Sequence, residues 1–267
     1  MTASLLRHPM APGPEGVVHR ITPDDAGWNY VGFEVLDLAP GQTVSRHDAG
    51  RETCLVLVSG HAAIRGAGHD FGEIGGRSSP FEGSPWSVYV PAGTPWQVRA
   101  AADGCELAIC TSPGKGGLPP RLIAPDDVGQ ETRGTGTNTR HVRNILPDTS
   151  PAETLLVVEV VTPGGHWSSY PPHKHDVNDP PRETYLEETY YHRLARPSGF
   201  AVQRVYTDDR SLDETMAVAD RDVVLVPRGY HPVGAPHGFD LYYLNVMAGP
   251  VREWRFTIAP EYAFLGW

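Results

Sequence analysis

The segment from His173 to His231 contains three short motifs: HKH at 173–175, ETYYHRL at 188–194 and VLVPRGYH at 224–231. The second and third motifs are rich in Val, Leu and Tyr, which favour β-strands. The third ends in a Pro-x-Gly sequence that is typical of a tight turn. These motifs therefore predict strands that bring histidine and glutamate side chains to strand ends.

The first half of the chain holds a similar series: His47, then ETCLVLVSG from Glu52, then VYVPAGTPW at 88–96. Glu52 precedes Pro91 by 39 positions, and Glu188 precedes Pro227 by the same 39. In both halves the glutamate opens a strand-like run and the proline ends one. The chain is therefore predicted to contain two copies of one β-unit.

Short strand-like runs occur along the whole chain, whereas long stretches with helical periodicity are nearly absent. The 29 glycines and 26 prolines are spread between these runs, as expected for many turns. The sequence predicts an all-β protein, either a sandwich or a barrel. The predicted strands are Val31–Leu38, Thr53–Val58, Ser87–Val90, Leu107–Thr111, Thr154–Val161, Thr189–Leu194, Phe200–Tyr206, Val223–Pro227, Leu241–Val246 and Glu253–Ile258.

Two stretches near the middle look like a connection between domains. Residues 112–120 read SPGKGGLPP, and residues 129–138 are polar and rich in Gly and Thr. We therefore expect an N-terminal domain over residues 1–125 and a C-terminal domain over residues 126–267.

The composition excludes several classes of function. The net charge of -10 argues against binding to nucleic acid or to an anionic membrane surface. The cysteines Cys54, Cys105 and Cys110 are odd in number, which argues against a disulfide framework and favours buried core thiols. The sequence shows neither a secretion signal nor an apolar run long enough to span a membrane, so a cytoplasmic protein is expected.

His173 and His175 can chelate one ion from one face of a strand, because alternate side chains point the same way. Glu188 opens a following strand, and His231 follows the turn at 227–229, so both can complete a metal site. Glu187 is the alternative to Glu188. The 39-residue spacing favours Glu188, as does its shared face with Tyr190 and His192.

The first half has kept only part of this set. His47 and Glu52 persist, but Ser45 stands at the position of the first histidine, and Pro95 and Trp96 stand near the position of the last. We expect this half to have a structural role, or to contribute to the dimer or to the rim of the pocket. His47 and Glu52 are expected to form a hydrogen-bonded pair rather than a site.

The pattern of H-x-H, Glu and a later Pro-x-Gly with histidine resembles the cupin superfamily, and the duplication resembles a bicupin. Within it, the sequence closely resembles the 5-deoxy-glucuronate isomerase family. The stretches that carry the likeness are WSSYPPHKHD (167–176), LEETYYHRL (186–194), VLVPRGYHPV (224–233), DLYYLNVMAGPVREWRF (240–256), AGWNYVGFEVLDL (26–38) and FEGSPWSVYVPAGT (81–94).

The resemblance implies two tandem cupin β-barrels (double-stranded β-helices), the first degenerate. It places the metal ligands at His173, His175, Glu188 and His231. The ion would be divalent, zinc first, with manganese or iron as alternatives. Two departures from the plain motif affect Glu188 and His231: twelve residues separate His175 from Glu188, and the spacing after Pro227 is one residue short. His237 is the alternative to His231.

The implied activity is an aldose–ketose isomerisation that converts 5-deoxy-D-glucuronate to 2-deoxy-5-keto-D-gluconate in myo-inositol catabolism. The metal would stabilise an enediolate, and His192 and Tyr190 would move protons. Arg182 and Arg228 are predicted to bind the carboxylate of this small anionic sugar acid. A homo-oligomer, most simply a dimer, is expected.

Two other functions fit the same residues. An iron-dependent cupin dioxygenase could use three histidines and one glutamate with open coordination positions. A non-catalytic sugar-binding bicupin is the second alternative, and the intact ligand set argues against it. The fold alone does not choose between them.

Overall fold

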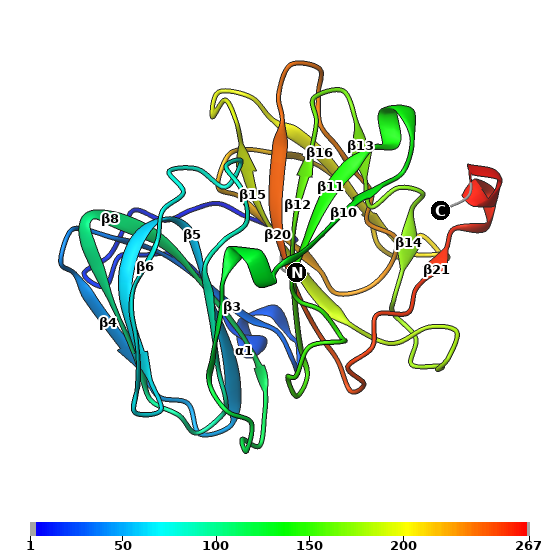
Figure 1. Ribbon diagram of the computed structural model, residues 1–267. Coiled ribbons are helices and arrows are strands. Elements are labelled where there is room, and N and C mark those ends of the chain that lie inside the picture. The colour runs from blue at the N-terminus through cyan, green and yellow to red at the C-terminus, as the bar shows by residue number, and fades with distance from the viewer. Residues whose placement is uncertain (1–3, 266–267) are drawn as a thin grey trace. The chain divides into compact units, whose positions relative to one another are not determined.

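The computed structural model describes residues 4–265. Within these residues the chain forms 21 strands, one four-residue α-helix and three short 3₁₀ helices. The prediction of an all-β protein is therefore confirmed (Figure 1). None of the described helices is long and apolar enough to cross a membrane.

The chain divides into two compact units, and their residues interleave along the sequence. The N-terminal unit comprises residues 9–129 and 144–157. The C-terminal unit comprises residues 4–8, 130–143 and the chain from residue 158 onward. The boundary at residue 125 that the sequence suggested stays a prediction.

The N-terminal unit is built on one sheet in the order β2-β3-β8-β5-β7-β9, with β4 paired to β8 and β6 paired to β5. Leu55, Leu57 and Ile64 of β5 pack with Leu107 and Ile109 of β8 in one apolar core. The elements are β2 (Val17–Ile21), α1 (Pro23–Ala26), β3 (Gly32–Leu38), β4 (Thr43–Arg46), β5 (Arg51–Gly66), β6 (His69–Gly75), β7 (Ser87–Val90), β8 (Trp96–Pro113), β9 (Arg121–Ile123) and η1 (Pro125–Asp127).

The C-terminal unit contains a seven-stranded sheet in the order β1-β18-β15-β20-β12-β11-β10, a four-stranded sheet in the order β13-β19-β16-β17, and the pair β14-β21. Its elements are β1 (Leu6–Arg7), β10 (Gly129–Arg133), η2 (Gly136–Asn138), β11 (Arg140–Leu146), β12 (Leu155–Thr162), β13 (Trp167–Ser168), β14 (His173–Lys174), β15 (Glu187–Leu194), β16 (Ala201–Tyr206), β17 (Asp213–Val218), β18 (Val223–Val226), β19 (Val233–Gly234), β20 (Leu241–Ala248), β21 (Thr257–Ile258) and η3 (Pro260–Leu265).

Residues 129–138, which the sequence suggested as part of a connection between domains, contain β10 and η2. The boundary between the two compact units falls within this stretch, at residues 129–130. β10 is the last strand of the seven-stranded sheet, and four of its five residues are exposed. An edge strand exposed on both faces needs no apolar residues, so its sequence GQETR looks like a loop.

Strand pairing shows which residue of the N-terminal unit occupies the position of Glu188. In the C-terminal unit, Glu188 of β15 pairs with Val226, the residue before Pro227, and with Met247 of β20. In the N-terminal unit it is Thr53 of β5, and not Glu52, that pairs with Val90, the residue before Pro91. Thr53 therefore stands where Glu188 stands, and Glu52 corresponds to Glu187.

Glu52 is fully buried on the other face of β5, where it supports the N-terminal unit. Its carboxylate does not form the expected pair with His47, whose side chain is exposed. Six donors surround it instead: the hydroxyls of Tyr89 (2.6 Å), Ser112 (3.1 Å) and Thr154 (3.4 Å) and the backbone N–H groups of Glu153 (2.8 Å), Thr154 (2.6 Å) and Leu155 (2.8 Å).

Candidate metal centre

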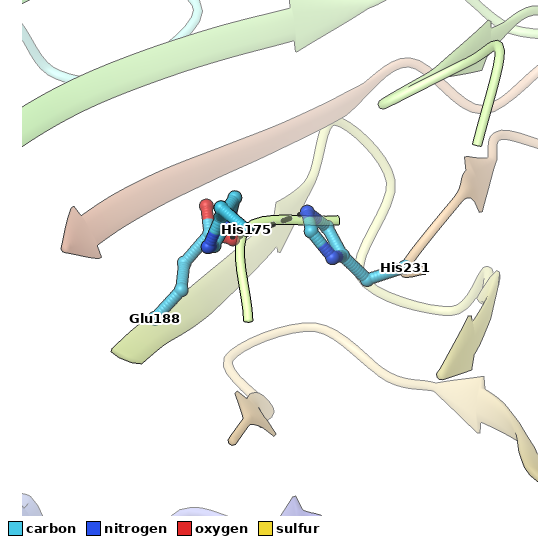
Figure 2. A group of neighbouring side chains, drawn as sticks. All are labelled: His175, Glu188 and His231. Carbon is cyan, nitrogen blue, oxygen red and sulfur yellow. Dashed lines mark hydrogen bonds and ion pairs between the residues drawn. The ribbon is translucent and has the colours of Figure 1, made fainter. Parts of the chain in front are cut away.

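His175, Glu188 and His231 converge inside the C-terminal unit, with their ligand atoms all within 4.8 Å of one another. His175 follows β14, Glu188 lies near the start of β15, and His231 follows the turn after β18. All three side chains are buried. Figure 2 shows the two imidazole rings and the carboxylate turned toward one another.

The backbone fixes which nitrogen of each ring faces the centre. Nδ1 of His175 lies 3.0 Å from the carbonyl oxygen of Leu186, and Nδ1 of His231 lies 2.8 Å from that of Gly229. A carbonyl oxygen only accepts, so each Nδ1 carries the hydrogen and donates it. Each neutral ring therefore presents the lone pair of Nε2 to the centre, which is how metal-binding histidines are usually held.

Three electron-pair donors consequently meet in one buried place. Oε2 of Glu188 lies 3.1 Å from Nε2 of His175 and 3.2 Å from Nε2 of His231. Nε2 of His231 is buried and, within the described chain, has no hydrogen-bond partner. Facing lone pairs repel unless a cation lies between them, so these residues fit a metal ion with mixed nitrogen and oxygen ligation.

His173 lies at the edge of this group. Its ring centroid is 4.9 Å from that of His231 and 6.3 Å from that of His175, and it too is buried. Its Nδ1 lies 3.4 Å from the carbonyl oxygen of Pro171, so it has the same ring orientation as its neighbours. His173 therefore lies beside the three converging side chains, but it is not among those whose ligand atoms lie within 4.8 Å of one another.

Burial keeps most of these rings neutral. It lowers the pKa of His231 to about 4, against the attraction of Glu188. Burial and the neighbouring histidines hold the pKa of His173 well below its ordinary value. For His175 burial acts in the same direction, but the hydrogen bond and charge of Glu188 outweigh it and raise its pKa. The carboxylate of Glu188 thus favours a positive charge beside Nε2 of His175.

Asn245 of β20 holds the other oxygen of the glutamate. Its Nδ2 donates to Oε1 of Glu188 at 2.7 Å, and both side chains are buried. With Oε1 engaged, Oε2 remains directed at the two histidines. The sequence reasoning missed Asn245, although its even spacing from Tyr243 along a predicted strand could have indicated a shared face.

Tyr190 and His192 lie on the same face of β15 as Glu188, at increasing distance from it. The hydroxyl of Tyr190 lies 2.8 Å from Oγ of Ser169, and its ring is 5.7 Å from that of His231. His192 stacks on Tyr190 at 5.9 Å and is hydrogen-bonded to Gln203 at 2.9 Å. Of the two, only Tyr190 lines the cavity beside Glu188 and His173.

The other predicted residues lie elsewhere. Arg182 is exposed and pairs with Asp179, and Arg228 is exposed near Ser211. The structure brings neither arginine to the cavity. Glu187 points away from the centre, on the opposite side of the strand, and His237 is exposed.

Two arginines that sequence reasoning missed do line this cavity. They are Arg133 of β10 and Arg140 of β11. Both arginines precede His173 by more than thirty residues, and their strands carry no metal-binding pattern. Only the sheet order, in which β11 and β10 follow β12, places them beside the centre (Figure 1).

The chain is similar to proteins of known name along nearly its whole length. The model of the KduI/IolB family matches residues 5–265. A protein from Geobacillus thermodenitrificans named 5-deoxy-glucuronate isomerase is 56% identical over 96% of this chain and 93% of its own. One of the same name from Bacillus subtilis strain 168 is 49% identical over 93% of this chain and 92% of its own.

Solved structures agree with these sequence relatives. The crystal structure of an IolB-like protein from Salmonella typhimurium matches with a TM-score of 0.96 and 53% identity, covering 99% of this chain and 100% of the other. An oxalate decarboxylase from Lactobacillus farciminis matches with a TM-score of 0.67 and 14% identity, over 98% of this chain and 90% of its own. The second likeness shows the fold alone, which is the predicted bicupin. On the full-length match, this chain belongs to the KduI/IolB family.

Proposed function

We propose that the protein is an aldose–ketose isomerase that converts 5-deoxy-D-glucuronate to 2-deoxy-5-keto-D-gluconate in myo-inositol catabolism. The observation that supports this most directly is the meeting of His175, Glu188 and His231 in one buried place. Relatives at 47–56% identity carry the name 5-deoxy-glucuronate isomerase.

The ligands of the proposed centre are His173, His175, Glu188 and His231. The ion is divalent, with zinc as the first choice and manganese or iron as alternatives, because mixed nitrogen and oxygen ligands accept all three. When bound, it supplies a Lewis acid that offsets negative charge developing on the carbonyl and hydroxyl oxygens of the substrate.

Isomerisation moves a proton between adjacent carbons by way of an enediolate. In this proposal Tyr190 donates and recovers a proton at a substrate oxygen, since burial holds its pKa well above the ordinary value and keeps the phenol protonated. The hydroxyl of Ser169 is hydrogen-bonded to the phenol of Tyr190 at 2.8 Å. In this proposal His192, which stacks behind Tyr190, is the base: its buried Nδ1, which has no partner in the described structure, takes the proton from one substrate carbon and returns it to the next.

The test is conversion of 5-deoxy-D-glucuronate by purified protein, followed by NMR, with elemental analysis of the same sample. We expect a product of unchanged mass, a bound divalent metal, and loss of activity on chelation that metal restores. His175→Ala should reduce kcat/KM by at least about 1,000-fold, as for loss of a catalytic metal ion. His237→Ala, which removes an exposed histidine, should leave it unchanged.

Other outcomes identify the alternatives. Oxygen uptake with oxidised products would indicate a dioxygenase, and sugar-acid binding without turnover would indicate a binding protein. Full activity in His175→Ala would refute a metal-assisted mechanism. The homodimer stays a prediction, which the molar mass from light scattering checks.

A further inference from the structure

The cavity beside the metal centre has a positively charged wall. Arg133 and Arg140 line it together with Glu188 and His173. The two arginines come from neighbouring strands, β10 and β11, of one sheet. One cavity is thus lined by two arginines and by two of the proposed metal ligands.

Arg140 is the more buried of the pair, with only 4% of the residue exposed. Its Nη1 donates to the carbonyl oxygen of Asn138 at 3.1 Å, which holds one edge of the guanidinium. Burial lowers its pKa from the ordinary value. Tyr243, Glu131 and Tyr190 act against this shift, and the charge of Arg133 adds to it. Two positive charges buried side by side destabilise each other. An anion bound in the cavity would offset this repulsion.

Arg133 is the second arginine that lines the cavity. Its guanidinium lies 4.9 Å from the ring centre of Trp254 and pairs with Glu131 at 2.6 Å. Trp254, which also lines the cavity, belongs to the irregular segment before β21 and is only partly buried. The cavity has a volume of about 20 Å³, enough for a water molecule. The cavity must therefore widen before it can admit a six-carbon acid.

We propose that Arg140, assisted by Arg133, binds the carboxylate of the substrate and thereby selects sugar acids over neutral aldoses. This inference deepens the proposed isomerase function and rests on it for the identity of the substrate. The aldehyde end of the sugar lies at Glu188 and the histidines, and the carboxylate lies against the guanidinium groups. A planar guanidinium matches a carboxylate through two parallel hydrogen bonds, which gives direction as well as charge.

The experiment compares a charged ligand with a neutral one of the same shape. Binding of D-glucuronate and D-glucuronamide is measured by calorimetry on the metal-loaded wild type, Arg140→Gln, Arg140→Lys and Arg133→Gln. Turnover of 5-deoxy-D-glucuronate is measured in parallel. Arg143→Gln is the matched control, because Arg143 lies on the same strand but its Nη1 pairs with Glu159 at 2.8 Å, away from the cavity.

Arg140→Gln should weaken glucuronate binding roughly 10- to 100-fold and raise KM by a similar factor, with little change in glucuronamide binding. Arg140→Lys, which keeps the charge, and Arg133→Gln should each weaken glucuronate binding several-fold. These two decide the question if Arg140→Gln does not fold. Arg143→Gln should lower the melting temperature without changing the preference for the charged ligand.

The proposal would be overturned if the Arg140 variants lost affinity equally for glucuronate and glucuronamide. It would also be overturned if they lost affinity for neither ligand. The two proposals fail separately. Arg140-dependent binding of glucuronate without isomerisation would leave the carboxylate site standing and reject the isomerase. If the variants isomerise the substrate and keep the wild-type preference for the charged ligand, the isomerase stands and the carboxylate site is rejected.

Discussion

Asn245 shows how one neutral side chain sets the direction of a ligand. It occupies Oε1 of Glu188, so the lone pairs of Oε2 face the histidines. Asn245→Ala leaves a buried carboxylate oxygen unsatisfied and free to rotate. We expect metal affinity to fall about 10- to 100-fold, as for other partners that orient a ligand.

Competition with a chelating indicator measures this affinity directly. The control is Gln203→Ala, which removes a buried amide from His192 and not from Glu188. Equal affinities for Asn245→Ala and the wild type would show that Glu188 needs no such support.

His192 determines part of the dependence of stability on pH. Burial lowers its pKa to about 4, against the hydrogen bond to Gln203. The unfolded chain binds this proton near pH 6.5 and the folded chain only near pH 4. The free energy of unfolding is therefore undiminished above about pH 6.5 and falls as the pH drops toward 4, by up to about 3 kcal/mol from this residue.

Urea unfolding of metal-free protein between pH 7 and pH 4.5 checks the sign and size. His173 and His231, whose pKa values are also lowered, contribute in the same direction. His192→Leu should therefore flatten the curve without abolishing its slope, whereas His237→Ala should leave it unchanged. Superimposable slopes for the wild type and His192→Leu would contradict the assignment.

At the scale of strands, the repeat spacing selected Glu188 through an alignment that the pairing does not support. The spacing matched Glu52 with Glu188, but register matches Thr53 with Glu188. The two glutamates should consequently respond in opposite ways. Glu52→Gln should lower the melting temperature and leave kcat/KM unchanged. The substitution weakens the hydrogen bonds that the carboxylate accepts from the backbone N–H groups of residues 153–155.

Glu188→Gln should abolish activity and leave the melting temperature of the metal-free protein nearly unchanged, since one lone-pair donor is replaced by a neutral amide. Thermal unfolding without metal and the isomerase assay with metal measure the two properties. A drop in activity for Glu52→Gln at temperatures where it is folded would show that its role reaches beyond structure.

The strands that the sequence predicted well are short and apolar. β7 was predicted and found at Ser87–Val90, whereas β5 continues from the predicted Thr53–Val58 to Gly66. The extension SGHAAIRG has no alternation of apolar and polar residues, so only its pairing with β6 and β8 makes it a strand. The histidines could be predicted because their spacing is local. Arg140 could not, because its place depends on sheet order.

At the scale of the molecule, each of the two units includes a segment from the other half of the sequence. Residues 4–8 belong to the C-terminal unit, where Leu6 pairs with Val224 and Leu5 is buried. Residues 144–157 belong to the N-terminal unit. A fragment that starts at residue 126 would therefore lack the strand that covers the edge of β18, the strand that leads into His231.

Deletion of residues 1–8 should accordingly destabilise the metal-bearing unit, although it removes no proposed ligand. It loses the burial of Leu5, the hydrogen bond from the N–H of Leu225 to the carbonyl of Leu5 at 2.9 Å, and the contact of His8 with Asp222 at 2.8 Å. We expect a loss of about 3 kcal/mol in the free energy of unfolding. Leu5→Ala should reproduce roughly half of it, and Arg7→Ala, which keeps the backbone pairing, should have little effect.

Because β18 leads directly to His231, the deletion should also weaken metal binding in proportion to the fraction unfolded. Chemical denaturation with and without metal measures both quantities, and a deletion variant as stable as the full chain would show that β1 only lies against β18 without supporting it.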